Sequence, residues 1–320
     1  MYASSARRRA GALCRHEDTV TQEDGIVTKS LTPSVEGHIL VAAGAVCISF
    51  AGLFVKEAPM PPAMVAFYRL LFGGIVLTLF AAVRGERLLP PLPMLGVMAA
   101  AALCFSGDLT SWHECIVRLG PGFATIICNF QVFFLALWGT FMLGEQLSLG
   151  HKLAMPVAVI GLMMLLEKAP GELSAEVVVG LLTGIVSALF YSAYILVLRR
   201  SQSTACKLPA VANMGIISLL SMSMIGVYCL AAGDSFVVPD LRTLGLLALL
   251  GVGCQAAGWV LLSSGLPRMP ASRAGLIMLT QPALSFIWDI LFYNRPTGAV
   301  GYAGAAVTIA AVGFGIAKAK

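Results

Sequence analysis

Long apolar runs recur along the whole chain of 320 residues, and short polar turns separate them. A helix needs about 20 consecutive apolar residues to cross the hydrocarbon core of a bilayer. Such a segment must satisfy its own backbone hydrogen bonds within the membrane, so it folds as a helix. Only 12% of the residues are charged, against roughly 25% in a soluble domain. The sequence therefore predicts an all-α polytopic membrane protein.

Turn residues divide the apolar sequence into ten segments. The turns include APMPP, LGPG, KAPGE and YNRPTG, and all are short, so nearly all of the mass should lie in the membrane. We expect ten transmembrane helices at about residues 38–55, 63–83, 93–117, 121–143, 150–167, 177–198, 208–231, 241–264, 271–293 and 298–317.

Residues 1–35 are polar and contain no apolar core, so we expect a disordered cytoplasmic tail and not a secretory signal peptide. With this tail in the cytoplasm, most of the 21 Lys and Arg residues fall on the cytoplasmic side, as the positive-inside rule requires. Both termini should then be cytoplasmic, in a multi-pass protein of a bacterial inner membrane. Five basic residues are expected on the opposite side, namely Lys56, Arg118, Lys168, Arg242 and Arg295.

The two halves of the chain are weakly similar. The segment NFQVFFLALWGTFML aligns with LTQPALSFIWDILFY, which places Gln131 against Gln281 at an offset of 150 residues. Upstream, Lys56 aligns with Arg199 at an offset of 143, and the offsets rise smoothly between these points. Five spans per half is an odd number, so the second half enters the membrane from the opposite side. The sequence predicts two inverted five-helix repeats around a central cavity, a common design of secondary transporters, with boundaries at residues 36–168 and 176–318.

The pattern resembles the drug/metabolite transporter superfamily, in its EamA-type branch of ten-helix carriers. The segment FMLGEQLSLGHKLAMPVAVIGLMML resembles the LGE turn and Gly-rich closing helix of that family, and the similarity covers about residues 37–317. The polar third span next to LGPGFATIICNF is most similar to the YddG-type exporters of aromatic amino acids. This resemblance implies a carrier whose third, fourth, eighth and ninth helices line the cavity. The halves also differ, since Arg295 stands where the first half has Glu145.

The third span contains DLTSWHEC, with Asp108 and His113 in an apolar environment. An Asp at the centre of a spanning helix costs about 2.5–3.5 kcal/mol, so such residues usually face the bundle interior or a water-filled cavity. Asp108 is therefore a candidate for a functional role, and the alternative is that it pairs with Arg69 or caps a helix break. For His113 the alternative is a ring wetted at the membrane interface.

All four tryptophans lie in spans 3, 4, 8 and 9, and Asn and Gln side chains occur in the same spans. Interfacial aromatic belts and polar contacts between helices are the alternative explanations. A cavity lined by aromatic rings and amides suits a small zwitterion with an apolar side chain. The candidate substrate-binding residues are Trp112, His113, Asp108, Asn129, Gln131, Tyr191, Gln255, Trp259 and Gln281.

The sequence has no GxxxxGK[ST], HExxH or GxSxG motif, so we expect no enzyme, no cofactor and no metal site. We also expect no nucleic-acid partner; the partners are a small molecule and the lipid bilayer. The sequence predicts a secondary transporter that exports small amphipathic metabolites by alternating access, with aromatic or large apolar amino acids as substrates. Proton coupling through Asp108 or His113 and facilitated diffusion both remain open. The alternatives are an exporter of drugs or other metabolites and an intramembrane aspartyl protease that uses Asp108 and Asp289.

Overall fold

The computed structural model describes residues 35–143, 149–166, 174–202, 208–265, 268, 277–278 and 280–317, and all regular elements in these ranges are helices. The first half contains α2 (Val35–Ser49), α3 (Ala51–Glu57), α4 (Pro62–Val83), α5 (Leu92–Leu119), α6 (Pro121–Cys128), α7 (Gln131–Leu143) and α8 (Leu149–Leu166). The second half contains α9 (Ala175–Gln202), α10 (Ala210–Ala232), α11 (Leu241–Ala248), the π-helix η2 (Leu249–Ala257), α12 (Gly258–Gly265), α14 (Thr280–Tyr293) and α15 (Ala299–Ala317).

The helices coincide with the apolar segments of the sequence. Six of them are long and apolar enough to cross a membrane, and these are Val35–Glu57, Pro62–Val83, Met94–Leu119, Ala175–Val197, Ala210–Ala232 and Leu241–Gly265. Shorter apolar helices occur at Pro121–Leu135, Lys152–Leu165 and Ala299–Phe314. The prediction of an all-α polytopic membrane protein is therefore confirmed, and the number of ten spans stays a prediction. The expected N-terminal tail, up to residue 34, lies outside the described residues.

Large apolar side chains cover the outside of the bundle. Leu79, Phe141, Leu182 and Leu291 are each at least 60% exposed, although they belong to four different helices. A soluble monomer rarely exposes so much apolar surface over so many elements. The outer faces of the helices are thus suited to contact with lipid chains.

Proline and glycine set several helix ends. Pro62 and Pro121 begin α4 and α6, where a missing backbone N–H leaves no hydrogen bond unmade. Gly120 joins α5 to α6 with φ +88°, a conformation that favours glycine. Asp240 caps α11 by accepting a hydrogen bond of 2.7 Å from the backbone N–H of Thr243, which lowers the pKa of this exposed carboxyl.

Several apolar segments are interrupted helices. The chain passes from α6 to α7 through backbone hydrogen bonds of the i→i−3 type, including Phe130 to Ile127 and Val132 to Asn129. Another segment passes from α11 through the π-helix η2 to α12. π-Helical turns are rare and often occur at functional sites, because they reorient a side chain relative to the α-helical register. Polar Asn129, Gln131 and Gln255 stand at these interruptions.

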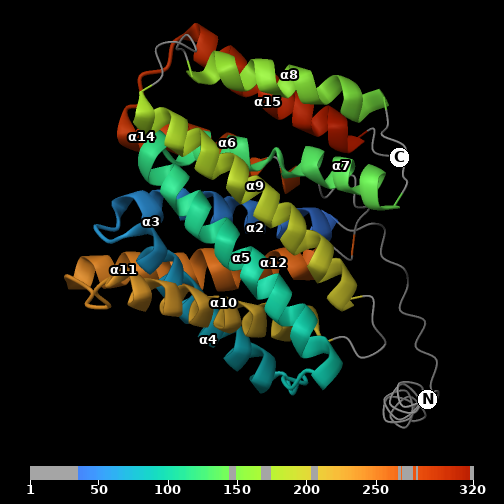
Figure 1. Ribbon diagram of the computed structural model, residues 1–320, viewed down its shortest axis with the longest axis vertical. Helices are drawn as coiled ribbons and strands as arrows, with labels where there is room; N and C mark the ends of the chain where they lie inside the picture. The colour runs from blue at the N-terminus through green and yellow to red at the C-terminus, as the bar shows by residue number, and fades with distance from the viewer. Residues whose placement is uncertain are drawn as a thin grey trace.

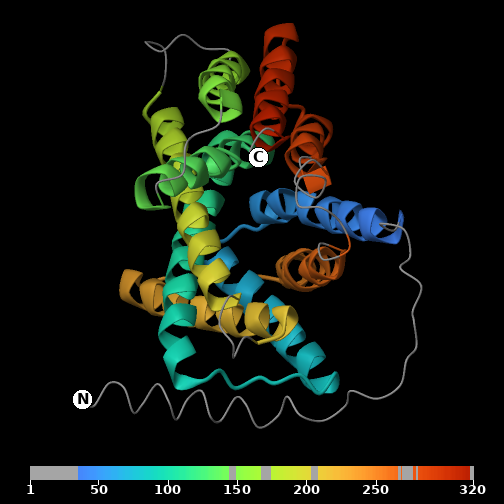
Figure 2. The same ribbon diagram turned by 90° about the vertical axis from the view of Figure 1, so that its right-hand side faces the viewer.

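The described helices of the two halves pack against one another in pairs. Figure 1 shows the helices stacked from α8 and α15 at the top to α4 and α10 at the bottom. The main helix pairs are α5 with α9, α2 with α12, α4 with α10, α6 with α14, and α8 with α15. In Figure 2 the pair of α5 and α9 lies on one side of the molecule, and α2 with α12 lies on the other. Every one of these pairs joins an element of the first half to an element of the second.

Two glycines allow α4 and η2 to approach closely. A Cβ added at Gly73 would lie 2.4 Å from Cγ of Gln255, and one added at Gly251 would lie 2.6 Å from Cβ of Phe72 and 3.0 Å from the carbonyl oxygen of Arg69. Small residues at such contacts let helix backbones come together in a membrane. This approach brings the side chain of Gln255 to α4.

Replacing Gly251 with Ala should lower the free energy of unfolding by about 1–3 kcal/mol, because the added Cβ overpacks the contact between α4 and η2. The matched control is Gly253→Ala in the same π-helix, where nothing lies within 4 Å of an added Cβ. The control should keep or slightly raise stability, since Ala is the better helix former. Thermal unfolding in detergent micelles measures both variants, and equal melting temperatures would contradict the packing argument.

Candidate functional site

A cluster of polar side chains is buried where α4, α5, α9 and η2 meet. Arg69 is 4% exposed, Asp108 is 7% exposed, and His113 and Gln255 are fully buried. Arg69, Asp108 and His113 come from the first half of the chain, and Gln255 comes from the second. Charged groups are costly in such surroundings unless neighbouring groups compensate them, so the partners of each side chain matter.

Arg69 is held on one edge and one face of its guanidinium. Its Nε donates a hydrogen bond of 2.9 Å to Oε1 of Gln255, whose Nε2 in turn lies 3.4 Å from Oγ of Ser218. The guanidinium carbon lies 5.4 Å from the ring centroid of Trp112, within the range of a cation–π interaction. The Nη1 atom is buried and has no hydrogen-bond partner.

Asp108 binds a neutral partner from α9. The hydroxyl of Ser187 donates a short hydrogen bond of 2.6 Å to its Oδ1, and Sγ of Cys128 lies 3.0 Å from the same hydroxyl. The charges of Asp108 and Arg69 are near enough to attract each other, and both lie close to Tyr191. Within the described part of the chain, however, Asp108 and Arg69 do not form an ion pair within 4.0 Å. The predicted alternative of a direct Arg69–Asp108 pair is therefore not what the structure has.

His113 is fixed in one orientation by the start of α4. Its Nδ1 lies 3.1 Å from the carbonyl oxygen of Pro62, and because a carbonyl only accepts, Nδ1 carries the proton. In the neutral ring the other nitrogen, Nε2, is then an acceptor, and it is buried without a partner. The His113 ring lies 5.4 Å from that of Trp112. The ring is thus buried in the bundle, and not wetted at the interface.

The other residues that the sequence predicted differ in whether they contact this cluster. Tyr191 joins the cluster through its proximity to Asp108 and Arg69, as described above. The buried Oε1 of Gln131 has no partner, and its backbone carbonyl accepts a hydrogen bond of 3.1 Å from Ser192 on α9. Asn129 instead donates to the carbonyl of Thr125 within its own helix, at 2.7 Å. Within the described ranges, no hydrogen bond or ring contact links Asn129, Trp259 or Gln281 to the cluster.

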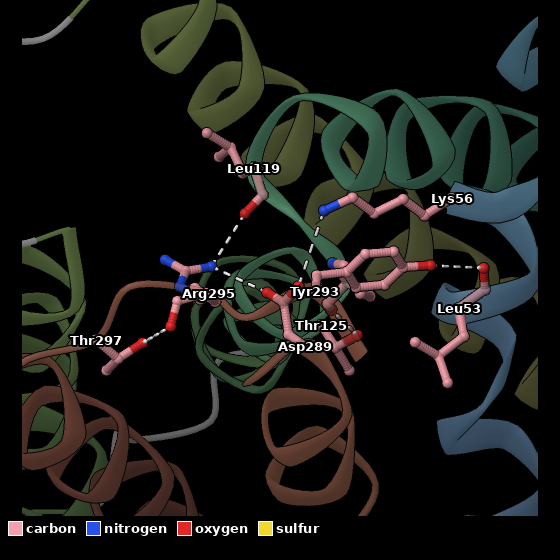
Figure 3. A network of polar contacts seen from close by, with 9 residues as sticks. Leu53, Lys56, Leu119, Thr125, Asp289, Tyr293, Arg295 and Thr297 are labelled. Carbon is pink, nitrogen blue, oxygen red and sulfur yellow. Dashed lines mark hydrogen bonds and ion pairs between the residues drawn. The ribbon is translucent and has the colours of Figure 1, made fainter. Parts of the chain in front are cut away.

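A second polar network lies at the C-terminal end of α14, close to the C-terminal end of α5 (Figure 3). The carboxylate of Asp289 is almost fully buried, and it lies 3.1 Å from Nη1 of Arg295 and 3.9 Å from Nζ of Lys56. Nη1 of Arg295 also donates to the carbonyl oxygen of Leu119 at 3.0 Å. The ring of Tyr293 lies 4.1 Å below Nζ of Lys56. The network therefore ties α3 and the end of α5 to α14.

The turn between α5 and α6 is shaped to admit this carboxylate. A Cβ added at Gly120 would lie 2.6 Å from Oδ2 of Asp289, and one added at Gly122 would lie 2.6 Å from Cα of Phe286. The sequence LGPG therefore serves two needs, a positive φ at Gly120 and close packing against α14. Lys56 and Arg295 both belong to the set expected on the extracytoplasmic side, so this network marks one end of the bundle.

The structure separates the two acids of the protease alternative. Asp108 has its partners on α9 and α4, whereas Asp289 has its partners on α3 and after α14. A catalytic dyad needs two carboxylates that share one proton, and these two belong to different networks. Among the described residues, no group of three His, Cys, Asp or Glu side chains is arranged to hold a metal ion.

The candidate binding residues from the sequence left out three charged residues that the structure places in these networks, namely Arg69, Lys56 and Arg295. The signal for Arg69 was present, because it is an Arg inside a spanning segment. Lys56 and Arg295 look like ordinary loop charges in the sequence. Only the fold brings them to Asp289.

Comparison with known proteins gives a consistent result. The EamA-like transporter family matches residues 35–167 and 178–315. The pseudopaline exporter CntI of Pseudomonas aeruginosa is 24% identical over 86% of this chain and 94% of its own length. An uncharacterized transporter of Archaeoglobus fulgidus is 23% identical over the same shares. A solved crystal structure shares the fold, with a TM-score of 0.63 and 18% identity, over 87% of this chain and 95% of the other.

Replacing Asp289 with Ala should lower the free energy of unfolding by about 3 kcal/mol or more, because it leaves the partly buried Arg295 and Lys56 without their counter-charge. The control is Arg242→Ala, which removes the exposed partner of Glu57 at the same end of the bundle. An exposed pair contributes about 0–1 kcal/mol, so the control should change little. Thermal unfolding in detergent compares the two, and a control as unstable as Asp289→Ala would overturn the assignment.

Proposed function

Because the chain belongs to the EamA-like transporter family, we propose that it exports small amphipathic metabolites across a bacterial inner membrane by alternating access. Aromatic or large apolar amino acids are the proposed substrates. The observation that carries this proposal is the buried cluster of Arg69, Asp108 and His113, which retains unpartnered hydrogen-bonding atoms between the two halves. Polar groups in a membrane bundle usually mark the substrate pathway.

The surroundings of the cluster favour a substrate with an apolar side chain. Trp112 and Tyr191 place aromatic rings beside the charged groups, and Tyr194 stacks on Phe105 behind them at 4.9 Å. The exporter CntI, to which the chain is similar, is named for the export of pseudopaline, which supports export of a small molecule. Another metabolite or a drug is the second candidate, and the transport assay below separates it from amino acids.

The packing of the helices supports the inverted repeat. If residues 36–168 and 176–318 are equivalent halves of five spans, then α4, α6 and α8 correspond to α10, α14 and α15. These helices pack against their own counterparts. The remaining pair, α5 with α9, corresponds to α12 with α2, which is also in contact. The whole set of pairs is therefore unchanged when the halves are exchanged, as expected for ten spans related by a two-fold axis.

Alternating access requires one end of the bundle to be closed while the other opens. The network of Asp289, Lys56 and Arg295 joins the two halves at the end that charge counting assigns to the outside, with both termini in the cytoplasm. We propose that this network holds the outer end closed and separates when substrate leaves. The interrupted helices α6/α7 and α11/η2/α12 supply the irregular backbone that transporters place near their substrate sites.

Uptake of labelled Phe, Leu, Thr and Lys into proteoliposomes tests the substrate class. Phe and Leu should enter faster than Thr and Lys, because only they combine a zwitterionic head with a large apolar side chain. Empty liposomes are the control for leakage. Uptake of none of the four would refute amino-acid export and favour another metabolite.

Two substitutions at His113 separate its structural and transport roles. Asn places an amide nitrogen near the position of Nδ1, so His113→Asn should keep the bond to Pro62 and the melting temperature while it loses the Nε2 acceptor. The initial rate of uptake should fall about tenfold, the typical effect of one lost hydrogen bond of about 1 kcal/mol or slightly more. His113→Gln should show the reverse, with a lower melting temperature and a smaller loss of rate. A wild-type rate in His113→Asn would make the ring purely structural.

A further inference from the structure

The Nη1 nitrogen of Arg69 is a charged donor that is buried without a hydrogen-bond partner. Arg69 is 4% exposed, its Nε is bonded to Gln255, and Nη1 has no partner although no solvent reaches it. Buried donors are almost always bonded, and an exception calls for an explanation such as a bound ligand. A charged donor carries a larger penalty than a neutral one, so this atom needs an acceptor during the working cycle.

The neighbours of Arg69 hold its guanidinium in one orientation. Gln255 holds the Nε edge at 2.9 Å, and the ring of Trp112 lies beside the guanidinium at 5.4 Å. Gly73 and Gly251 allow η2 to approach α4 closely enough for the bond to Gln255 to form. The guanidinium is therefore held in one orientation, and the hydrogen-bonding capacity of its Nη1 is unused. A planar fork of donors in a fixed orientation matches the geometry of a carboxylate.

Asp108 is the partner expected for Arg69 within the protein, but its carboxylate bonds to another side chain. Asp108 accepts from Ser187 at 2.6 Å and does not form an ion pair with Arg69 within 4.0 Å. Each charge is bonded to a neutral side chain from the second half, Gln255 or Ser187. The two opposite charges therefore lie near each other without forming an ion pair. Each can still pair with a group of the opposite charge on a ligand.

We propose that Arg69 binds the carboxylate of the substrate and that Asp108 binds its protonated amine. This proposal rests on the proposed function and specifies the substrate class as molecules that carry both groups. A simple anion would satisfy Arg69 but meet repulsion from Asp108, and a simple cation would meet the reverse. A phosphate monoester carries about two negative charges against a site that is neutral overall, so it fits poorly.

Three ligands of similar size test the proposal on the purified full-length protein. Phenylalanine carries both groups, phenethylamine lacks the carboxylate, and 3-phenylpropionate lacks the amine. Ligand-induced shifts of the melting temperature in detergent give the dissociation constants. Wild-type protein should bind phenylalanine at least about tenfold more tightly than either analogue, because each analogue leaves a buried charge unpaired.

The variants then assign the two groups. In Arg69→Gln the preference for phenylalanine over phenethylamine should disappear, while the preference over 3-phenylpropionate persists. Asp108→Asn should show the opposite pattern. Arg69→Lys keeps the cation without the planar fork and should retain part of the preference for the carboxylate. Arg84→Gln, which changes an exposed Arg at the end of α4, is the matched control and should bind like wild type.

Each outcome bears on one proposal or on both. Wild-type protein that binds phenethylamine as tightly as phenylalanine overturns the role of Arg69, even if Arg69→Gln fails to fold. If wild type and Arg69→Gln have the same ratio of dissociation constants for phenethylamine and phenylalanine, the role of Arg69 is overturned as well. The proposal of phenylalanine export would not be affected by that result. If the binding pattern is as expected but vesicles do not transport phenylalanine, the export proposal fails and the role of Arg69 stands. Binding of none of the three ligands overturns both.

Discussion

The cost of placing charge inside an apolar bundle governs the rest of this structure. An isolated charge in such surroundings is strongly unfavourable, so every buried charge must find compensation nearby. Here the compensation repeatedly comes from the other half of the chain: Gln255 for Arg69, Ser187 for Asp108, and Lys56 for Asp289. These polar contacts join the same two halves of the chain that the apolar helix pairs join.

The two polar networks differ in how their buried charges are compensated, and this difference indicates different roles. Asp289 has two cations beside it and an extra bond from Arg295 to the chain at Leu119. It is fully compensated, and its network needs nothing more. Arg69 and Asp108 have only neutral hydrogen-bond partners, and Nη1 of Arg69 has none. A network that is complete suits a structural closure, whereas one that lacks a partner suits a binding site.

The apolar periodicity and the turn residues were sufficient to predict the helices, because a membrane segment must satisfy its backbone internally whatever its neighbours are. The same reasoning indicated that Asp108, Trp112 and His113 are unusual, and the structure places all three around Arg69. The link from Arg69 to Gln255 could not be predicted in this way. It depends on a π-helix and on two close glycine contacts, and neither has a clear signature in a single sequence. Likewise, the partners of Asp289 are far from it in sequence or follow a turn.

The balance of charge in the central cluster also constrains how transport is driven. One Arg and one Asp give a site that is neutral overall, and a zwitterion adds no net charge when it binds. Its passage therefore gains nothing from the membrane potential, which supplies about 2.3 kcal/mol per elementary charge per 100 mV only when net charge moves. If the substrate is the zwitterion that we propose, its gradient alone would drive export, unless a proton moves with it. Since Asp108 meets the amine in the proposed pose, substrate binding and any proton transfer through Asp108 would compete for the same carboxylate oxygens.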